Sequence, residues 1–249
     1  MHIRLAGGAV EAEAWGDGAR WAVEHVPDLL GFGDDPSSFV PDHRLLRDLQ
    51  LRATGMRFGS TLTVMEVLVP TILGQKVTTR ESHRSYRRLV DAYGGPAPGP
   101  HEFRLPPRAA VLAGLPYYDF HPLGIERKRA DIIKAAAGRA GALEEIVGMP
   151  AGQAVQRLMT FPGIGPWTAA FVMAAAVGDA DAVPVGDYHL PNTVAWALAR
   201  EPRADDRRML ELLEPYRGHR GRVIRLLKQA GIRAPKYGPR STIRNFERS

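Results

Sequence analysis

The most constraining feature of the sequence is segment 158–168, in which Pro-Gly-Ile-Gly-Pro separates two stretches with helical signals. The first proline ends the incoming helix, and the second fits the first turn of the next helix, where an N–H is not needed. Gly163 and Gly165 permit positive φ and leave their amides uncovered, while Ile164 between them can plug the angle between the helices. This pattern predicts a tight turn with bare N–H groups at a helix N-terminus, an anion site that a phosphate can approach.

The rest of the chain is mostly helical in its pattern. Helical signals cover 63–93, 107–115, 126–140, 149–159, 167–177, 191–200, 207–213 and 221–230. Pro70 and Gly74 predict a break or kink inside the first of these segments. The first 16 residues alternate weakly between turn signals, which predicts one or two short strands. We therefore expect a mainly α protein with a small N-terminal β element.

We expect the helices to form two lobes. The expected division is a β-containing segment over 1–45, a helical lobe over 46–177 that ends with the helices joined by the turn, a second helical lobe over 178–232, and a basic tail over 233–249.

Positive charge is concentrated near the C-terminal end of the sequence. Residues 200–249 hold 14 Lys and Arg against 6 Asp and Glu, whereas residues 1–199 hold 19 against 21. A focused basic segment is typical of a polyanion binder. A second interpretation stays open, because 28 of the 33 cationic residues are Arg, which GC-rich coding also favours.

Several classes of protein are excluded by what the sequence lacks. It has no cysteine, which excludes disulfides, thiolate zinc sites, cysteine-held iron–sulfur clusters and a cysteine nucleophile. The longest apolar run, 167–177, is about half of what a bilayer span needs, and the first residues contain no long apolar stretch of the secretory type. We expect a cytoplasmic protein that does not enter the membrane.

Four segments along the chain match a known pattern. They are Ile72-Leu73-Gly74-Gln75-Lys76-Val77-Thr78, Leu123-Gly124-Ile125 with Lys128, Phe161-Pro162-Gly163-Ile164-Gly165 followed by Trp167-Thr168-Ala169, and Asp187, 22 residues after Gly165. Together they resemble the helix-hairpin-helix DNA glycosylase superfamily, and most of all its alkylpurine branch, the 3-methyladenine glycosylase II type. The segments cover roughly residues 60–220, and the N-terminal segment is shorter than the sheet domain of the alkylpurine enzymes.

The resemblance implies a monofunctional DNA glycosylase of base excision repair, which flips a damaged, most often alkylated, purine out of the duplex and hydrolyses its N-glycosidic bond. It makes Asp187 the catalytic residue. A carboxylate about 4 Å from the positively charged sugar would contribute about 4 kcal/mol at an effective dielectric of about 20. Capping of the helix that begins near Pro191 is the alternative role for Asp187.

Hydrolysis is favoured over strand cleavage. Relatives that also cut the strand carry a nucleophilic Lys where this chain has Trp167. The next lysines along the sequence are Lys134 and Lys228. The resemblance also predicts a base pocket with Trp167, Phe171 and Tyr188, whose rings would favour a cationic purine, although core packing is an equal alternative for Phe171.

The resemblance also implies DNA contacts. The residues expected to make them are Gln75, Lys76, Gly163, Ile164, Gly165, Thr168, Arg217 and Arg220. Lys76 stands where relatives carry a Gln or an apolar wedge, and it is either a wedge or a solvated residue at a helix end. The backbone carbonyls of Met159, Phe161 and Ile164 would hold a structural Na⁺ or K⁺, and no other cofactor is expected.

The expected partner is double-stranded DNA with damaged bases, bound by a monomer at the nucleoid. Two alternatives stay open: a non-catalytic helix-hairpin-helix protein that binds distorted duplex, and a glycosylase for oxidised or deaminated bases. Asp187 argues against the first, because a pure DNA binder gains nothing from a carboxylate directed at phosphate-rich DNA.

Overall fold

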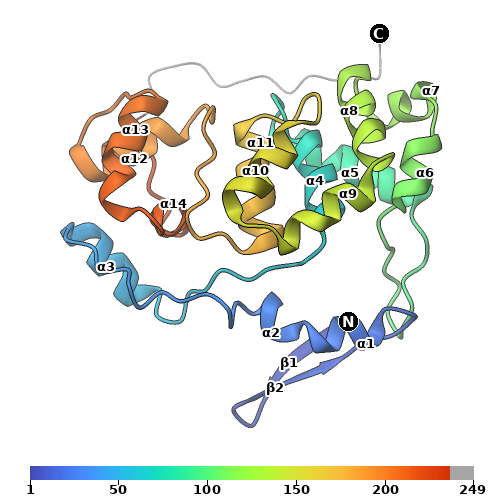
Figure 1. Cartoon of the computed structure of the whole chain (residues 1–249), viewed down its shortest axis with the longest axis horizontal. Coiled ribbons are helices and arrows are strands. Elements are labelled where there is room, and N and C mark those ends of the chain that lie inside the picture. The colour runs from blue at the N-terminus through green and yellow to red at the C-terminus, as the bar shows by residue number, and fades with distance from the viewer. Residues whose placement is uncertain (236–249) are drawn as a thin grey trace.

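The computed structural model describes residues 1–235, so most of the basic tail expected over 233–249 lies outside the described residues. The fold is mainly α with a small N-terminal β element, as predicted (Figure 1). Its strands are β1 (His2–Ala6) and β2 (Ala9–Glu13), and its α-helices are α1 (Ala19–Glu24), α2 (Val26–Leu29), α3 (Arg44–Arg52), α4 (Val64–Leu73), α5 (Thr79–Tyr93), α6 (Ala109–Gly114), α7 (Tyr117–Phe120), α8 (Arg127–Ala137), α9 (Ala140–Glu144), α10 (Ala151–Met159), α11 (Pro166–Val172), α12 (Leu190–Ala199), α13 (Asp206–Leu213) and α14 (Arg220–Gln229). Within residues 1–235, no helix has the length and apolar character needed to cross a membrane.

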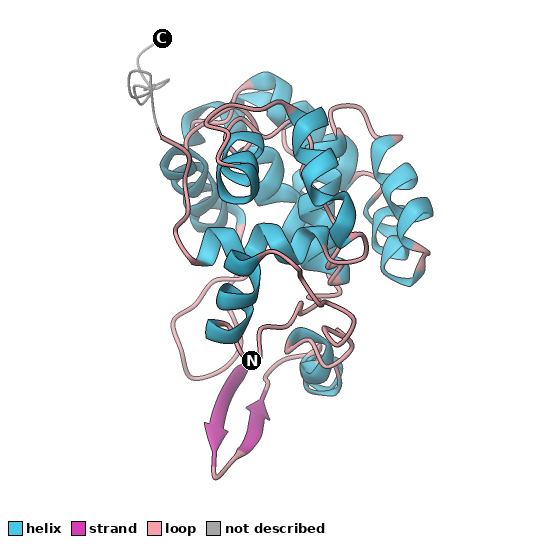
Figure 2. Ribbon diagram, turned by 90° about the vertical axis from the view of Figure 1, so that its left-hand side faces the viewer, coloured by secondary structure: helices cyan, strands magenta, loops and turns pink. Residues whose placement is uncertain are grey.

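The strands form a hairpin at the N-terminus. They pair antiparallel, from His2 opposite Glu13 to Ala6 opposite Ala9. Both residues of the connecting turn are glycines with positive φ, the conformation that fits the twist of a two-residue hairpin. The hairpin projects away from the helical body (Figure 2).

A first hydrophobic cluster has α4 near its centre. This helix buries Leu68, Ile72 and Leu73, and it packs against α5, α8 and α11. A helix that is apolar on most of its sides must be covered by neighbours on most of its sides. The turn of segment 158–168 is anchored in the same cluster through Phe161 and Ile164, which are both buried.

A second cluster joins α12, α13 and α14 with α3. Leu46 and Leu49 of α3 are buried with Val194, Met209 and other residues of the three later helices. Most of α3 was expected in the first helical lobe, over 46–177, but it packs with the helices expected in the second lobe, over 178–232. Figure 1 shows α3 on the side of α12–α14.

The predicted break inside 63–93 occurs at Gly74, whereas Pro70 lies inside α4. Helix α5 then begins with a capping box. The Thr78 hydroxyl accepts from the Glu81 N–H, and the Glu81 carboxylate accepts from the Thr78 N–H at 2.8 Å. These bonds satisfy N–H groups that the first turn of a helix leaves open, so they fix where α5 starts. The short connection between the helices carries Lys76.

Candidate active site and nucleic-acid interface

The turn between α10 and α11 depends on Gly163. Its φ is +84°, and a Cβ atom placed there would lie 2.3 Å from Ile132 Cδ1. Both conformation and space therefore require glycine at this position. Gly165 differs from the expectation of positive φ, because its φ is −98° and a Cβ there would meet nothing within 4 Å. The backbone at Gly163 is exposed, as a phosphate contact requires.

Ile164 fills the angle between the helices, as its position predicted. Its side chain is buried, and its N–H donates to the Phe161 carbonyl at 3.1 Å. That amide is therefore engaged within the turn rather than bare. The carbonyl of Phe161 is one of three, with Met159 and Ile164, that the resemblance assigns to a monovalent cation. Among the described residues, no group of three or more His, Cys, Asp or Glu side chains could hold a metal ion.

Gln75 connects the end of α4 to the turn. Its Nε2 donates to the Gly163 carbonyl and to the Thr168 hydroxyl, both at 3.0 Å. Thr168 is only 2% exposed. The structure thus brings Gln75, Gly163 and Thr168 together, with the two side chains acting inside the protein. The neighbouring Lys76 is exposed and has a φ of +56°, a left-handed conformation that is uncommon outside glycine.

Asp187 lies at the start of α12 and beside the first turn of α11. One carboxylate oxygen accepts from the N–H groups of His189 and Leu190, each at 2.9 Å, and the other accepts from Trp167 Nε1 at 3.1 Å. The capping role considered for this residue is therefore present, through the two N–H groups at the start of α12. Partial burial raises the pKa of Asp187, but the three hydrogen bonds and the charge of Lys228 outweigh it and leave that pKa below its usual value. The carboxylate is ionised at neutral pH.

The aromatic residues predicted for a base pocket do not all gather. The Trp167 and Phe171 rings lie 4.6 Å apart between centroids. Tyr188 is 87% exposed, and the ring that it contacts is that of His189. Phe171 lines a cavity.

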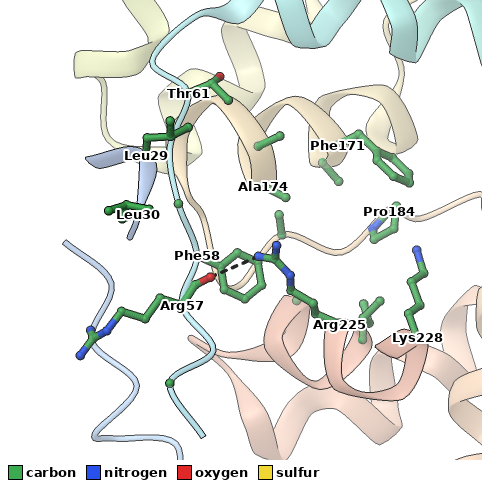
Figure 3. Close-up of a pocket in the computed structure, with 17 residues that line it drawn as sticks. Leu29, Leu30, Arg57, Phe58, Thr61, Phe171, Ala174, Pro184, Arg225 and Lys228 are labelled. Carbon is green, nitrogen blue, oxygen red and sulfur yellow. Dashed lines mark hydrogen bonds between the residues drawn. The ribbon is translucent and has the colours of Figure 1, made fainter. Parts of the chain in front are cut away.

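The cavity has a volume of about 630 Å³ and opens between α11, α14 and the extended segment before α4 (Figure 3). It is lined by Leu29, Leu30, Gly55, Arg57, Phe58, Gly59, Thr61, Ala170, Phe171, Ala174, Ala175, Ala182, Pro184, Gly221, Ile224, Arg225 and Lys228. Trp167 and Asp187 are not among the lining residues. Trp167 contacts the lining residue Phe171, and the charge of the lining residue Lys228 acts on Asp187.

Two lining residues, Arg225 and Lys228, were not singled out as site residues from the sequence. The Lys228 ammonium lies 5.4 Å from the centroid of the Phe171 ring, and the Arg225 guanidinium lies 4.7 Å from that of Phe58. They stand three residues apart on α14, so they share one helix face. That spacing was visible in the sequence, but the packing of α14 beside α11 was not.

Each of the two arginines expected to contact DNA is paired with a carboxylate of the protein, Arg217 at the exposed surface and Arg220 in a half-buried pair. Arg217 pairs with Glu214 at 2.6 Å, and Arg220 pairs with Asp181 at 2.5 Å. Asp181 also accepts from the Gly218 N–H, so it organises this loop. A DNA phosphate at either arginine would compete with a carboxylate that is already bound.

Proteins with similar sequences carry repair names. The chain is 31% identical over 172 residues to a Mycobacterium tuberculosis protein named as a probable bifunctional transcriptional activator/DNA repair enzyme AlkA, a match covering 65% of this chain and 34% of that protein. It is 32% identical over 117 residues to the Escherichia coli DNA-3-methyladenine glycosylase 2, covering 46% and 42% respectively. The matches thus span less than half of either relative. No family model matches the chain.

Solved structures share the fold over most of the chain. A 3-methyladenine DNA-glycosylase from Archaeoglobus fulgidus has a TM-score of 0.71 at 20% identity, covering 88% of this chain and 77% of that one. A Clostridium acetobutylicum 8-oxoguanine glycosylase/lyase in complex with duplex DNA also has a TM-score of 0.71, at 17% identity, covering 92% and 85%.

The solved structures thus share the fold of this chain, and its sequence relatives carry names that refer to DNA repair.

Proposed function

We propose that this protein is a monofunctional DNA glycosylase that hydrolyses the N-glycosidic bond of alkylated purines in duplex DNA and leaves an abasic site. The observation that carries the proposal is Asp187, an ionised carboxylate held between the Trp167 indole and the start of α12. It follows the helix-hairpin-helix in the chain and adjoins the cavity that Phe171 lines. The names of the sequence relatives support the same activity.

The Asp187 carboxylate acts on the sugar. As the C1′–N9 bond breaks, the sugar becomes an oxocarbenium-like cation, which a negative charge nearby stabilises. Coulomb attraction at about 4 Å, with an effective dielectric of about 20, amounts to about 4 kcal/mol, on the order of a thousandfold in rate. The Asp187 carboxylate also orients the attacking water, which supplies a hydroxyl to C1′ and a proton to the departing base.

The hairpin positions the DNA. The exposed backbone around Gly163, which a side chain does not cover, receives a phosphate at the N-terminal end of α11. The carbonyls of Met159, at the end of α10, and of Phe161 and Ile164, in the turn, would hold a Na⁺ or K⁺ ion, because hard oxygen donors suit such an ion. When bound, the ion neutralises phosphate charge.

Lys76 is the residue proposed to enter the gap left by the flipped nucleotide. It is exposed at the tip of the connection between α4 and α5, and Gln75 holds that connection against the hairpin. The wedge and the phosphate site thereby keep a fixed spacing. We propose that the protein acts as a monomer, and no step of this scheme needs a further cofactor.

A defined duplex with one alkylated purine tests the proposal. The protein should release the base and leave a strand that breaks only on later treatment with alkali. Borohydride added during the reaction should trap no covalent complex, because Trp167 stands at the position of the Schiff-base lysine. Binding without base release would instead support the non-catalytic alternative, and strand cleavage before alkali would overturn the monofunctional assignment.

A further inference from the structure

The cavity beside Asp187 has a marked charge bias. Among its described lining residues, the charged side chains are Arg57, Arg225 and Lys228, and none is acidic. The Arg57 guanidinium bonds to the Asp34 carbonyl and points away from the cavity, and that of Arg225 lies over Phe58 (Figure 3). Lys228 is therefore the cation placed on the side of the catalytic carboxylate.

The Lys228 ammonium lies over one face of the Phe171 ring. Its ammonium lies 5.4 Å from the Phe171 ring centroid, within the distance over which a cation and an aromatic face attract each other. Phe171 in turn contacts Trp167, which donates to Asp187. A positively charged base stacked on Phe171 would have to share that face with the ammonium or displace it.

The charge on the base decides how this ammonium acts. Purines alkylated at N3 or N7 carry a positive charge in DNA, so Lys228 repels them. An uncharged alkylated base, such as 1,N6-ethenoadenine, has no such penalty. When its bond to C1′ breaks, the electron pair stays on the base, which gains negative charge until a proton from the attacking water neutralises it. An ammonium nearby stabilises that charge.

We propose that Lys228 is a specificity-determining residue that shifts this pocket away from cationic alkylpurines and towards uncharged alkylated bases. This inference rests on the proposed function and deepens it, because it names a substrate class within the same site. It differs from the expectation that the aromatic rings of the pocket favour a cationic purine.

Paired duplexes test the inference. One carries 7-methylguanine and the other 1,N6-ethenoadenine, each on a 2′-fluorinated sugar that resists hydrolysis, and binding is measured by fluorescence anisotropy. Lys228→Met should raise the affinity for the cationic duplex relative to the neutral one by about fivefold, equivalent to about 1 kcal/mol. Lys228→Arg keeps the charge and should keep the wild-type ratio.

Release of the same two bases from ordinary duplexes gives a second readout. Lys228→Met should shift the ratio of single-turnover rates by about fivefold in the same direction. A binding ratio that changes less than twofold, or that changes equally in Lys228→Arg, overturns the inference. If the wild-type protein releases neither base, the proposed function fails, while the binding ratio still decides the role of Lys228.

Discussion

Replacing Asp187 with Asn removes one negative charge and keeps the size of the side chain. The remaining amide oxygen can still accept from the N–H groups of His189 and Leu190, so the start of α12 stays capped. The amide nitrogen then faces the Trp167 N–H, and that hydrogen bond is lost. Loss of one hydrogen bond lowers the free energy of unfolding by about 1 kcal/mol.

The effect on base release should be far larger than the effect on stability. The charge contributes about 4 kcal/mol to the transition state if it lies about 4 Å from the sugar at an effective dielectric of about 20. Mutation of comparable electrostatic groups in enzymes lowers rates by about a hundredfold to a thousandfold. We therefore expect base release to fall by at least about a hundredfold.

Single-turnover release from a duplex with one alkylated purine measures this loss, and anisotropy with the same duplex measures binding. Asp205→Asn is the matched control, because Asp205 caps α13 by accepting from the Arg208 N–H and is not among the residues that line the cavity. Release by Asp187→Asn within threefold of the wild type, with duplex binding intact, would remove the carboxylate from the mechanism.

The pH dependence follows from the lowered pKa of Asp187. Its ionised form persists as the pH falls through about 3.9, where an unfolded-state aspartate takes up a proton. The stability it contributes is therefore present above the unfolded-state pKa and is lost as the pH falls through the lower folded-state pKa. Base release should show no acid limb from this residue between pH 7 and 5, and a limb in that interval that disappears in Asp187→Asn would contradict the assigned direction.

Two further predictions concern the scaffold. Gly163→Ala should lower the free energy of unfolding by about 1–3 kcal/mol in urea titrations, because the added Cβ would meet Ile132 and the φ of this residue is positive. Gly165→Ala should change the free energy of unfolding by less than about 0.5 kcal/mol, because a Cβ there meets nothing. Equal losses would refute the distinction between the two glycines. Asp34→Ala should destabilise the protein by about 3–5 kcal/mol, because it leaves the buried Arg222 guanidinium without its carboxylate partner. Arg222 is 2% exposed and pairs with Asp34 at 2.5 Å. A loss below about 1 kcal/mol would show that the pair is dispensable.

The hairpin was predictable because its determinants are local. The prolines that flank the turn set where the helices stop and start, and α10 ends at Met159 while α11 begins at Pro166. The conformation of Gly165 was not predictable, since a glycine permits positive φ without requiring it. Only the contact of Gly163 with Ile132, across the fold, shows which of the two glycines is obligatory.

Long-range packing limited the remaining sequence predictions. Helix α3 was not among the predicted helical segments, and its packing against α14 is a contact between residues far apart in the sequence. Counting charges identified a basic segment, but acidic residues distant in sequence neutralise part of it: Asp181 pairs with Arg220, and Asp34 pairs with Arg222. Lys228 is far from Asp187 along the chain, so only the packed structure reveals its charge at the site.

Two samples of genomic DNA, one treated with a methylating agent to form cationic purines and one with chloroacetaldehyde to form uncharged etheno bases, provide the most direct measurement of the chemistry assigned to Asp187. After incubation with the wild-type protein, chromatography of the soluble fraction should show free alkylated purines, and untreated DNA should yield none. Asp187→Asn should bind the same DNA and release at least about a hundredfold less. Release of no base by the wild type, or equal release by both proteins, would contradict a glycosylase that depends on this carboxylate.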